Sequence, residues 1–283
     1  MKILFKLLCA AMILGATTMP GFAANKTIKM GTMTWEDLVP ITKITKRVLE
    51  DKGYDVEVTN FSEWGIAYAA LRKGDVQILA SQIDYAAHDY WHKYKTRLEK
   101  ISPVSYGLYQ ALAVPKYVDI DSVEDLNANA DKFNGRIVGI EPGSGLMQDA
   151  EDAVDAYNLD LKLISGSTAA MTAALKSAVA RKDWIVVTLW DPTWMFQEFD
   201  MKFLQDPKGV FAPPQAYYWI GHKGFSQDNP HVREVLAGIF VPLAVNRSIN
   251  TAVENGQTMD EAVDSWLQEH TDWVERWEDM KDD

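Results

Sequence analysis

The chain alternates short runs of β-branched and apolar residues with longer stretches whose apolar side chains recur every three or four positions. Thr27–Met33 and Asp55–Phe61 have the pattern of strands, and Pro40–Gly53 between them has the spacing of an amphipathic helix. The same pattern predicts further strands at Val76–Ala80, Gln110–Pro115, Arg136–Ile140, Leu161–Ile164, Ile185–Trp190 and Tyr217–Gly221. It predicts further helices at Ser62–Lys73, Asp84–Tyr94, Ser122–Ala130, Thr168–Lys182, from the glycine-rich turn to about Tyr157, and over most of the C-terminal region. This order is typical of an α/β fold with mostly parallel sheets flanked by helices.

The strands form two series, and the second series is inserted into the first. We expect a first lobe made of residues 24–114 and 215–283 and a second lobe made of residues 115–214. Two crossings, near Val114–Tyr117 and near Ala212–Tyr218, are expected to act as a hinge. Ligands of such folds bind where the strand ends of the two lobes face each other.

The first 23 residues have the features of a secretory signal peptide. Lys2 and Lys6 give a basic start, Leu7–Leu14 is apolar but too short to span a bilayer, and small residues precede a cleavage point after Ala23. This predicts export to the periplasm. Because the single cysteine, Cys9, lies inside the leader, the mature chain is expected to contain neither a disulfide nor a reactive thiol.

The charge and the aromatic content of the chain limit the classes of partner that it can bind. The formal net charge is −12, which disfavours binding to nucleic acid or to an anionic membrane surface. The chain has 10 Trp, 11 Tyr and 10 Phe, and so many rings indicate either an extensive core or an aromatic binding site. We assign Trp184, Trp266, Trp273 and Trp277 to the core.

No enzyme motif is present. Among the five histidines only His88 and His92 are four residues apart, and no HExxH pattern surrounds them. The segment Gly143–Gly145 lacks the spacing of a nucleophile elbow, and no P-loop or GxGxxG occurs. We expect no metal and no cofactor. An exported α/β enzyme that uses Glu36, Asp37 and Glu141 as acid and base remains the alternative, without a specific set of residues to support it.

The turn Glu141-Pro142-Gly143-Ser144-Gly145-Leu146 follows a predicted strand and opens a predicted helix. Glycines allow close approach of a ligand, and the exposed N–H groups of a helix start attract anions. Gly143, Ser144 and Gly145 are therefore candidates for binding a carboxylate. The alternative is an ordinary strand-to-helix turn.

Two tryptophans follow strand ends in the two lobes. Trp35 comes after the first strand, and Trp190 ends the last strand of the second series. Rings in these places can face each other across a cleft and attract a cation, including a quaternary ammonium without any N–H, with about 0.5–2 kcal/mol per ring. The alternative is that both rings belong to the core. An uncharged or simple amino-acid ligand would instead require a charged clamp.

Several segments resemble the substrate-binding proteins of glycine betaine/proline betaine-type ABC transporters. The resemblance extends over nearly the whole mature chain. It is carried by Gly139-Ile140-Glu141-Pro142-Gly143-Ser144-Gly145, by Ser165–Met171, by Val187–Phe196 and by Asp206–Phe211. It implies a two-lobed periplasmic binding protein fold of type II that closes on its ligand, a membrane permease as partner and a monomeric state.

The resemblance also implies roles for individual residues. Trp35 and Trp190 match tryptophans of an aromatic cage, the amides of the glycine-rich turn match a carboxylate site, and Asp37 matches a position that choline-type members use. The implied ligand is a quaternary ammonium compound such as glycine betaine. The related alternatives are choline, carnitine, trimethylamine N-oxide and a sulfonium zwitterion.

The sequence departs from the family pattern after the third strand. Gln82 stands where many members have a cage tryptophan, and Thr193 stands where a histidine is common. Three outcomes remain open: Tyr85 supplies the missing ring, Trp64 supplies it, or the cage is open on one side. Gln82 and Asp84 offer polar contacts that a plain glycine betaine site does not use.

Overall fold

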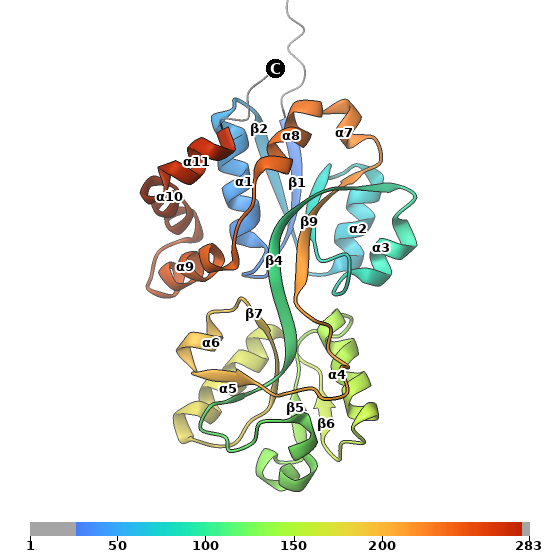
Figure 1. The fold of residues 1–283 in the computed structure, drawn as a ribbon, viewed down its shortest axis with the longest axis vertical. Coiled ribbons are helices and arrows are strands. Elements are labelled where there is room, and N and C mark those ends of the chain that lie inside the picture. Colours follow the sequence, from blue (N-terminus) through green and yellow to red (C-terminus); the bar gives the residue numbers. More distant parts are fainter. Residues whose placement is uncertain (1–26, 279–283) are drawn as a thin grey trace, which may run out of the picture.

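The computed structural model describes residues 27–278, and in this part of the chain a sheet of nine strands runs along the longest axis of the molecule (Figure 1). Its order is β2-β1-β3-β9-β4-β7-β5-β6, and β8 also pairs with β4. The strands are β1 (Thr27–Met33), β2 (Asp55–Phe61), β3 (Ile78–Ser81), β4 (Leu98–Pro115), β5 (Arg136–Val138), β6 (Lys162–Ile164), β7 (Val187–Asp191), β8 (Met201–Phe203) and β9 (Gln215–His222).

Helices cover both ends of this sheet. They are α1 (Val39–Asp51), α2 (Trp64–Lys73), α3 (His88–Tyr94), α4 (Gly145–Ala156), α5 (Thr168–Arg181), α6 (Met195–Glu198), α7 (Phe225–Asp228), α8 (Pro230–Gly238), α9 (Leu243–Glu254), α10 (Met259–Glu269) and α11 (Thr271–Glu278), with 3-10 helices at Val123–Asp125 and Asn127–Phe133. We call strands β1, β2, β3 and β9 with helices α1–α3 and α7–α11 the β1 half. We call strands β5–β8 with helices α4–α6 the β7 half (Figure 1).

Parallel pairing occurs within each half. Strand β1 pairs in parallel with β2 and β3, and β5 pairs in parallel with β6 and β7. Strands β4 and β9 run antiparallel to their neighbours, so the sheet as a whole is mixed. The carboxyl ends of β1, β3 and β7 are followed by the turns that carry the candidate site residues, as expected for an α/β fold. The predicted α/β architecture is confirmed.

Strand β4 connects the two halves. It pairs with β9 from Leu98 to Leu108 and with β7 from Tyr109 to Ala113. The change of partner falls between Leu108 and Tyr109, earlier along the chain than the predicted lobe boundary at 114/115. The lobe boundaries and the hinge crossings stay predictions.

The sequence pattern predicted only the second part of β4. The first part contains Pro103 and Gly107, and its register with β9 shifts three times, between Lys100 and Ser102, between Pro103 and Ser105, and between Tyr106 and Leu108. Each irregularity interrupts the alternation of inward and outward side chains by which a strand is recognised. The predicted signal peptide at residues 1–23 lies outside the described residues.

The core spans both halves. Helix α1 buries Ile41, Ile44 and Val48 against the sheet, and α2 ends at Gly74, whose φ of +81° suits glycine. Between residues 27 and 278, no single helix is long and apolar enough to cross a membrane. Helices α8 and α9 taken together are long and apolar enough for a membrane span, but the chain bends by 86° between them.

Candidate functional site

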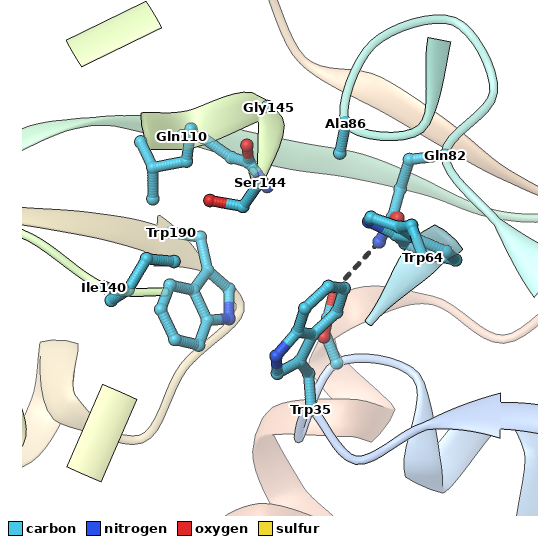
Figure 2. Close-up of a pocket in the computed structure, with 11 residues that line it drawn as sticks. Trp35, Trp64, Gln82, Ala86, Gln110, Ile140, Ser144, Gly145 and Trp190 are labelled. Carbon is cyan, nitrogen blue, oxygen red and sulfur yellow. Dashed lines mark hydrogen bonds between the residues drawn. The ribbon is translucent and has the colours of Figure 1, made fainter. Parts of the chain in front are cut away.

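A cleft lies between the two halves, and residues from both halves line it (Figure 2). The space between the side chains is about 370 Å³, and this volume includes the part that is open to solvent. The β1 half contributes Trp35, Asp37, Trp64, Gln82 and Ala86; strand β4 contributes Gln110; the β7 half contributes Ile140, Ser144, Gly145, Leu146 and Trp190. The turns after β1, β3 and β5, the start of α2 and the end of β7 thus converge on one pocket.

Three tryptophans form the aromatic wall of the cleft. Trp35 and Trp64 meet edge to face, with ring centroids 5.2 Å apart and an interplanar angle of 69°. Trp190 lies across the cleft from them (Figure 2). Trp64 and Trp190 are buried, and Trp35 is half-buried. Rings from both sides of a pocket are an arrangement that attracts a cation without a formal ion pair.

Asp37 is a buried carboxylate at the floor of this cleft. Its Oδ2 accepts hydrogen bonds from Gln82 Nε2 at 3.0 Å and from Tyr217 Oη at 3.1 Å, and Asn246 Nδ2 donates to its backbone oxygen at 2.8 Å. Burial raises the pKa of Asp37 from 3.8 to about 6, although the hydrogen bonds from Tyr217, the local backbone and Gln82 oppose the shift. At neutral pH the cleft therefore contains a negative charge beside the three rings.

The two halves touch around the cleft. Thr193 Oγ1, after β7, donates a hydrogen bond to Glu36 Oε1, after β1. Arg247 of α9 forms a two-pronged ion pair with Asp191, with Nε–Oδ1 and Nη2–Oδ2 distances of 3.1 and 3.0 Å. Burial raises the pKa of Glu36 from 4.5 to about 7, against the lowering effect of the bond from Thr193. These contacts join the halves in a closed arrangement.

Backbone also meets backbone between the halves. A Cβ atom placed on Gly145 would lie 2.8 Å from Ala86 Cα, so only glycine permits this approach. Gly145 is the first residue of α4, and Ser144 Oγ caps that helix by accepting a hydrogen bond from Met147 N at 3.3 Å. The start of α4, with the N–H groups of Gly145 and Leu146 that have no partner within the helix, thus lies at the wall of the cleft.

Most of the residues predicted from the sequence come together in this pocket. Its lining includes Trp35, Asp37, Gln82, Ser144, Gly145 and Trp190. Tyr85 and Gly143 line a neighbouring hollow instead, which shares Ala86, Ser144 and Gly145 with the cleft. Of the two rings considered for the place of the missing tryptophan, Trp64 lines the pocket and Tyr85 does not.

Sequence reasoning missed five lining residues or left them undecided. Trp64 begins α2 directly after β2, the neighbour of β1, and this position at the same sheet edge as Trp35 was the signal for it. The remaining four, without a recognisable chemical signal of their own, are Ala86, Gln110, Ile140 and Leu146.

Fold and cleft together define a ligand-binding protein of two halves. Comparison with known proteins gives the family. Residues 26–269 match the family model of the substrate-binding domain of ABC-type glycine betaine transport systems, and the chain belongs to this family. The resemblance drawn from the sequence motifs is confirmed. The family is one of transporter substrate-binding proteins, not of enzymes.

Individual relatives agree with this assignment. The chain is 36% identical over 162 residues to the glycine betaine/carnitine transport binding protein GbuC of Listeria monocytogenes, an alignment that covers 56% of this chain and 53%, about half, of GbuC. Among solved structures, lactococcal OpuAC in a closed-liganded conformation with glycine betaine is similar at a TM-score of 0.83 and 29% identity, covering 89% of this chain and 98% of that one. The glycine betaine/L-proline-binding protein ProX of Borrelia burgdorferi is similar at a TM-score of 0.82 and 26% identity, covering 89% and 96%. These matches confirm the type II periplasmic binding protein fold.

Proposed function

We propose that this chain captures glycine betaine or a closely related methylated ammonium compound in the cleft and delivers it to the membrane permease of an ABC importer. The observation that carries the proposal is the convergence of Trp35 and Trp64 from one half and Trp190 from the other on a pocket that also contains Asp37. Three ring faces and one buried anion are complementary to a soft, weakly hydrated cation. Glycine betaine, which OpuAC holds, and carnitine, for which GbuC is also named, belong to the same chemical class.

The other end of the ligand is assigned to the start of α4. Ser144 and Gly145 line the pocket, and Ser144 caps Met147 N. The N–H groups of Gly145 and Leu146, at the very start of the helix, have no carbonyl partner within it. A carboxylate at this place would gain from these donors and from the positive end of the helix dipole. A zwitterion can therefore bridge the cleft, with its ammonium group at the tryptophans and its carboxylate at α4.

The proposed function also implies where the protein acts and how its lobes move. We propose that residues 1–23 are removed as a signal peptide after Ala23, and that the mature chain acts as a monomer in the periplasm. The lobes would open and close about the two connections near the ends of β4 and β9. Glu36–Thr193 and Arg247–Asp191 support this proposal, because they join the two halves beside the cleft and would have to part for the lobes to open.

A thermal-shift screen of the mature chain tests the proposal. The compounds are glycine betaine, choline, carnitine, trimethylamine N-oxide and a sulfonium analogue, with glycine and ethanolamine as unmethylated controls. A true ligand raises the midpoint of unfolding in proportion to the logarithm of its excess over Kd. We expect at least one methylated compound to do so and neither control to match it. A screen in which none of them stabilises the protein contradicts the proposal.

A further inference from the structure

The Glu36 side chain lies between the two halves, outside the ligand cleft. It belongs to the turn between β1 and α1, and its Oε1 accepts a hydrogen bond from Thr193 Oγ1, in the turn after β7. Thr193 is 2% exposed, and Glu36 is half-buried. On its own side, Asn250 Nδ2 of α9 donates to the backbone oxygen of Glu36 at 2.9 Å. The turn that carries the carboxyl is thus held by the β1 half, whereas the carboxyl itself is covered from the β7 half.

The surroundings of Glu36 are acidic. An open hollow on the other side of Trp35 and Trp190 from the cleft is lined by Glu36, and its described lining contains no Lys, Arg or His. The charged groups that face Glu36 or line this hollow with it are carboxyls: Asp37 beside it in the chain, Glu254 of α9, Glu63 before α2 and Glu141 after β5. Arg247, one turn before Asn250 on α9, is paired with Asp191. Closure therefore covers a carboxyl that has acidic neighbours and no cation of its own.

We propose that Glu36 is a positioning residue for closure: the halves close over its neutral form, so that ligand binding takes up a proton at this carboxyl. The proposal rests on the proposed function, because it requires that a ligand closes the halves. Glu36 acts through the contact with Thr193 and does not touch the ligand, since it lines the hollow and not the cleft.

The direction of the pH dependence follows from the pKa of Glu36 in the two forms. In the closed form burial, Asp37 and Glu254 raise this pKa to about 7, although the bonds from Thr193 and from the backbone of Trp194 lower it. In an open form Thr193 and Trp194 move away, and the ordinary value of 4.5 applies. The contribution of Glu36 to closure is thus complete below about 4.5 and is lost as the pH rises through about 7.

The same two values give the size of the effect. Between pH 6 and pH 8 the open form stays ionised, while the closed form loses its proton. The affinity for a ligand should therefore fall by about three- to tenfold over this range, where the lower figure allows for solvent around a half-buried carboxyl.

Calorimetric titration of the wild-type mature chain and of Glu36→Gln, at pH 6 and pH 8, tests the proposal. Glycine betaine and choline are the probes, because neither changes its charge between these pH values. Glutamine keeps the size of the side chain and an oxygen for Thr193. The comparison is made with the variant because Asp37, with a pKa of about 6, titrates in both proteins. We expect Glu36→Gln to bind more tightly than the wild type at pH 8, and this advantage to shrink by about three- to tenfold at pH 6.

Proton uptake gives a second measurement that does not depend on affinity. Titrations at pH 6 in buffers of different ionisation enthalpy count the protons taken up with each ligand. The wild type should take up about 0.5–0.9 proton more than Glu36→Gln. Equal pH dependence of the two proteins, or equal proton uptake, overturns the inference and leaves the proposed function intact. Failure of both probes to bind at either pH contradicts the proposed function itself.

Two further variants complete the test. Glu63→Gln is the matched control, because Glu63 is an exposed carboxyl in the same hollow and no hydrogen bond joins its side chain to the β7 half in the described part of the chain. It should keep the wild-type pH dependence. Thr193→Val removes a bond that favours the charged form of Glu36, so it should take up more protons than the wild type at pH 8. This variant decides the question should Glu36→Gln fold poorly, and unchanged uptake at pH 8 would overturn the inference.

Discussion

Trp35 and Trp64 meet edge to face, with ring centroids 5.2 Å apart, although Trp35 lies in the turn after β1 and Trp64 begins α2 after β2. This contact places Trp64, not Tyr85, beside Trp35 in the lining of the cleft. We predict that Trp64→Ala weakens ligand binding by about 1–3 kcal/mol, since it removes one ring face and the support of Trp35. Titration calorimetry with the best ligand of the screen measures this loss.

Tyr85→Ala is the comparison for Trp64→Ala. It removes a ring that lines the neighbouring hollow and should leave the dissociation constant unchanged. The opposite pattern, a large effect of Tyr85→Ala and none of Trp64→Ala, would show that the ring of Tyr85 closes the cage.

Gly145→Ala tests the closing of the halves. In the closed form the new Cβ would lie 2.8 Å from Ala86 Cα, and backbone on both sides resists the shift. An open form has no such clash, so the unfolding midpoint of the free protein should be unchanged. We predict a loss of affinity of about 1–3 kcal/mol, typical of overpacking, and a larger radius of gyration at saturating ligand in solution scattering.

Gly166→Ala is the matched control for Gly145→Ala. The nearest atoms to its added Cβ, Gly139 O at 3.7 Å and Ala170 Cβ at 3.8 Å, are at ordinary contact distance. This variant should bind and scatter like the wild type. If Gly145→Ala does so too, the halves do not need to approach as closely as they do here.

Asp37 makes stability depend on pH. Its folded-state pKa of about 6 lies above the ordinary value of 3.8, so its contribution to stability is complete below about 3.8 and is lost as the pH rises through about 6. Asp37→Asn removes this titration. We predict that the variant is about 2–3 kcal/mol more stable at pH 7.5, relative to the wild type, than it is at pH 4.

Thermal unfolding of both free proteins at pH 4, 6 and 7.5 measures the effect of Asp37→Asn. Glu36, with a pKa of about 7, titrates in both proteins, and the variant lowers this pKa because the charge of Asp37 is one of the causes that raise it. A constant difference between the two midpoints across this range would show that burial does not raise the pKa of Asp37.

Local sequence patterns were sufficient for the elements that carry the site. Thr27–Met33 and Asp55–Phe61 form strands with the predicted bounds, and they pair with each other in an unbroken parallel register. Trp35 and Trp190 could be assigned to one cleft because both lie at the carboxyl ends of strands, where ligands bind in an α/β fold.

Features that depend on packing across the cleft could not be derived in this way. The choice between Trp64 and Tyr85 depends on where the turn after β3 points, and the first part of β4 is hidden by its bulges. The approach of Gly145 to Ala86 joins residues far apart in the chain, and no local pattern records it.

The claim that a methylated ammonium compound binds between the halves is tested most directly by calorimetric titration of wild type and Trp190→Ala with the same ligand. Trp190 is 5% exposed and is the aromatic residue that the β7 half contributes to the pocket. We predict saturable binding of one ligand per wild-type chain and a dissociation constant at least about tenfold higher for a folded Trp190→Ala, through lost ring contact and apolar burial. Equal affinities of the two proteins would contradict the account.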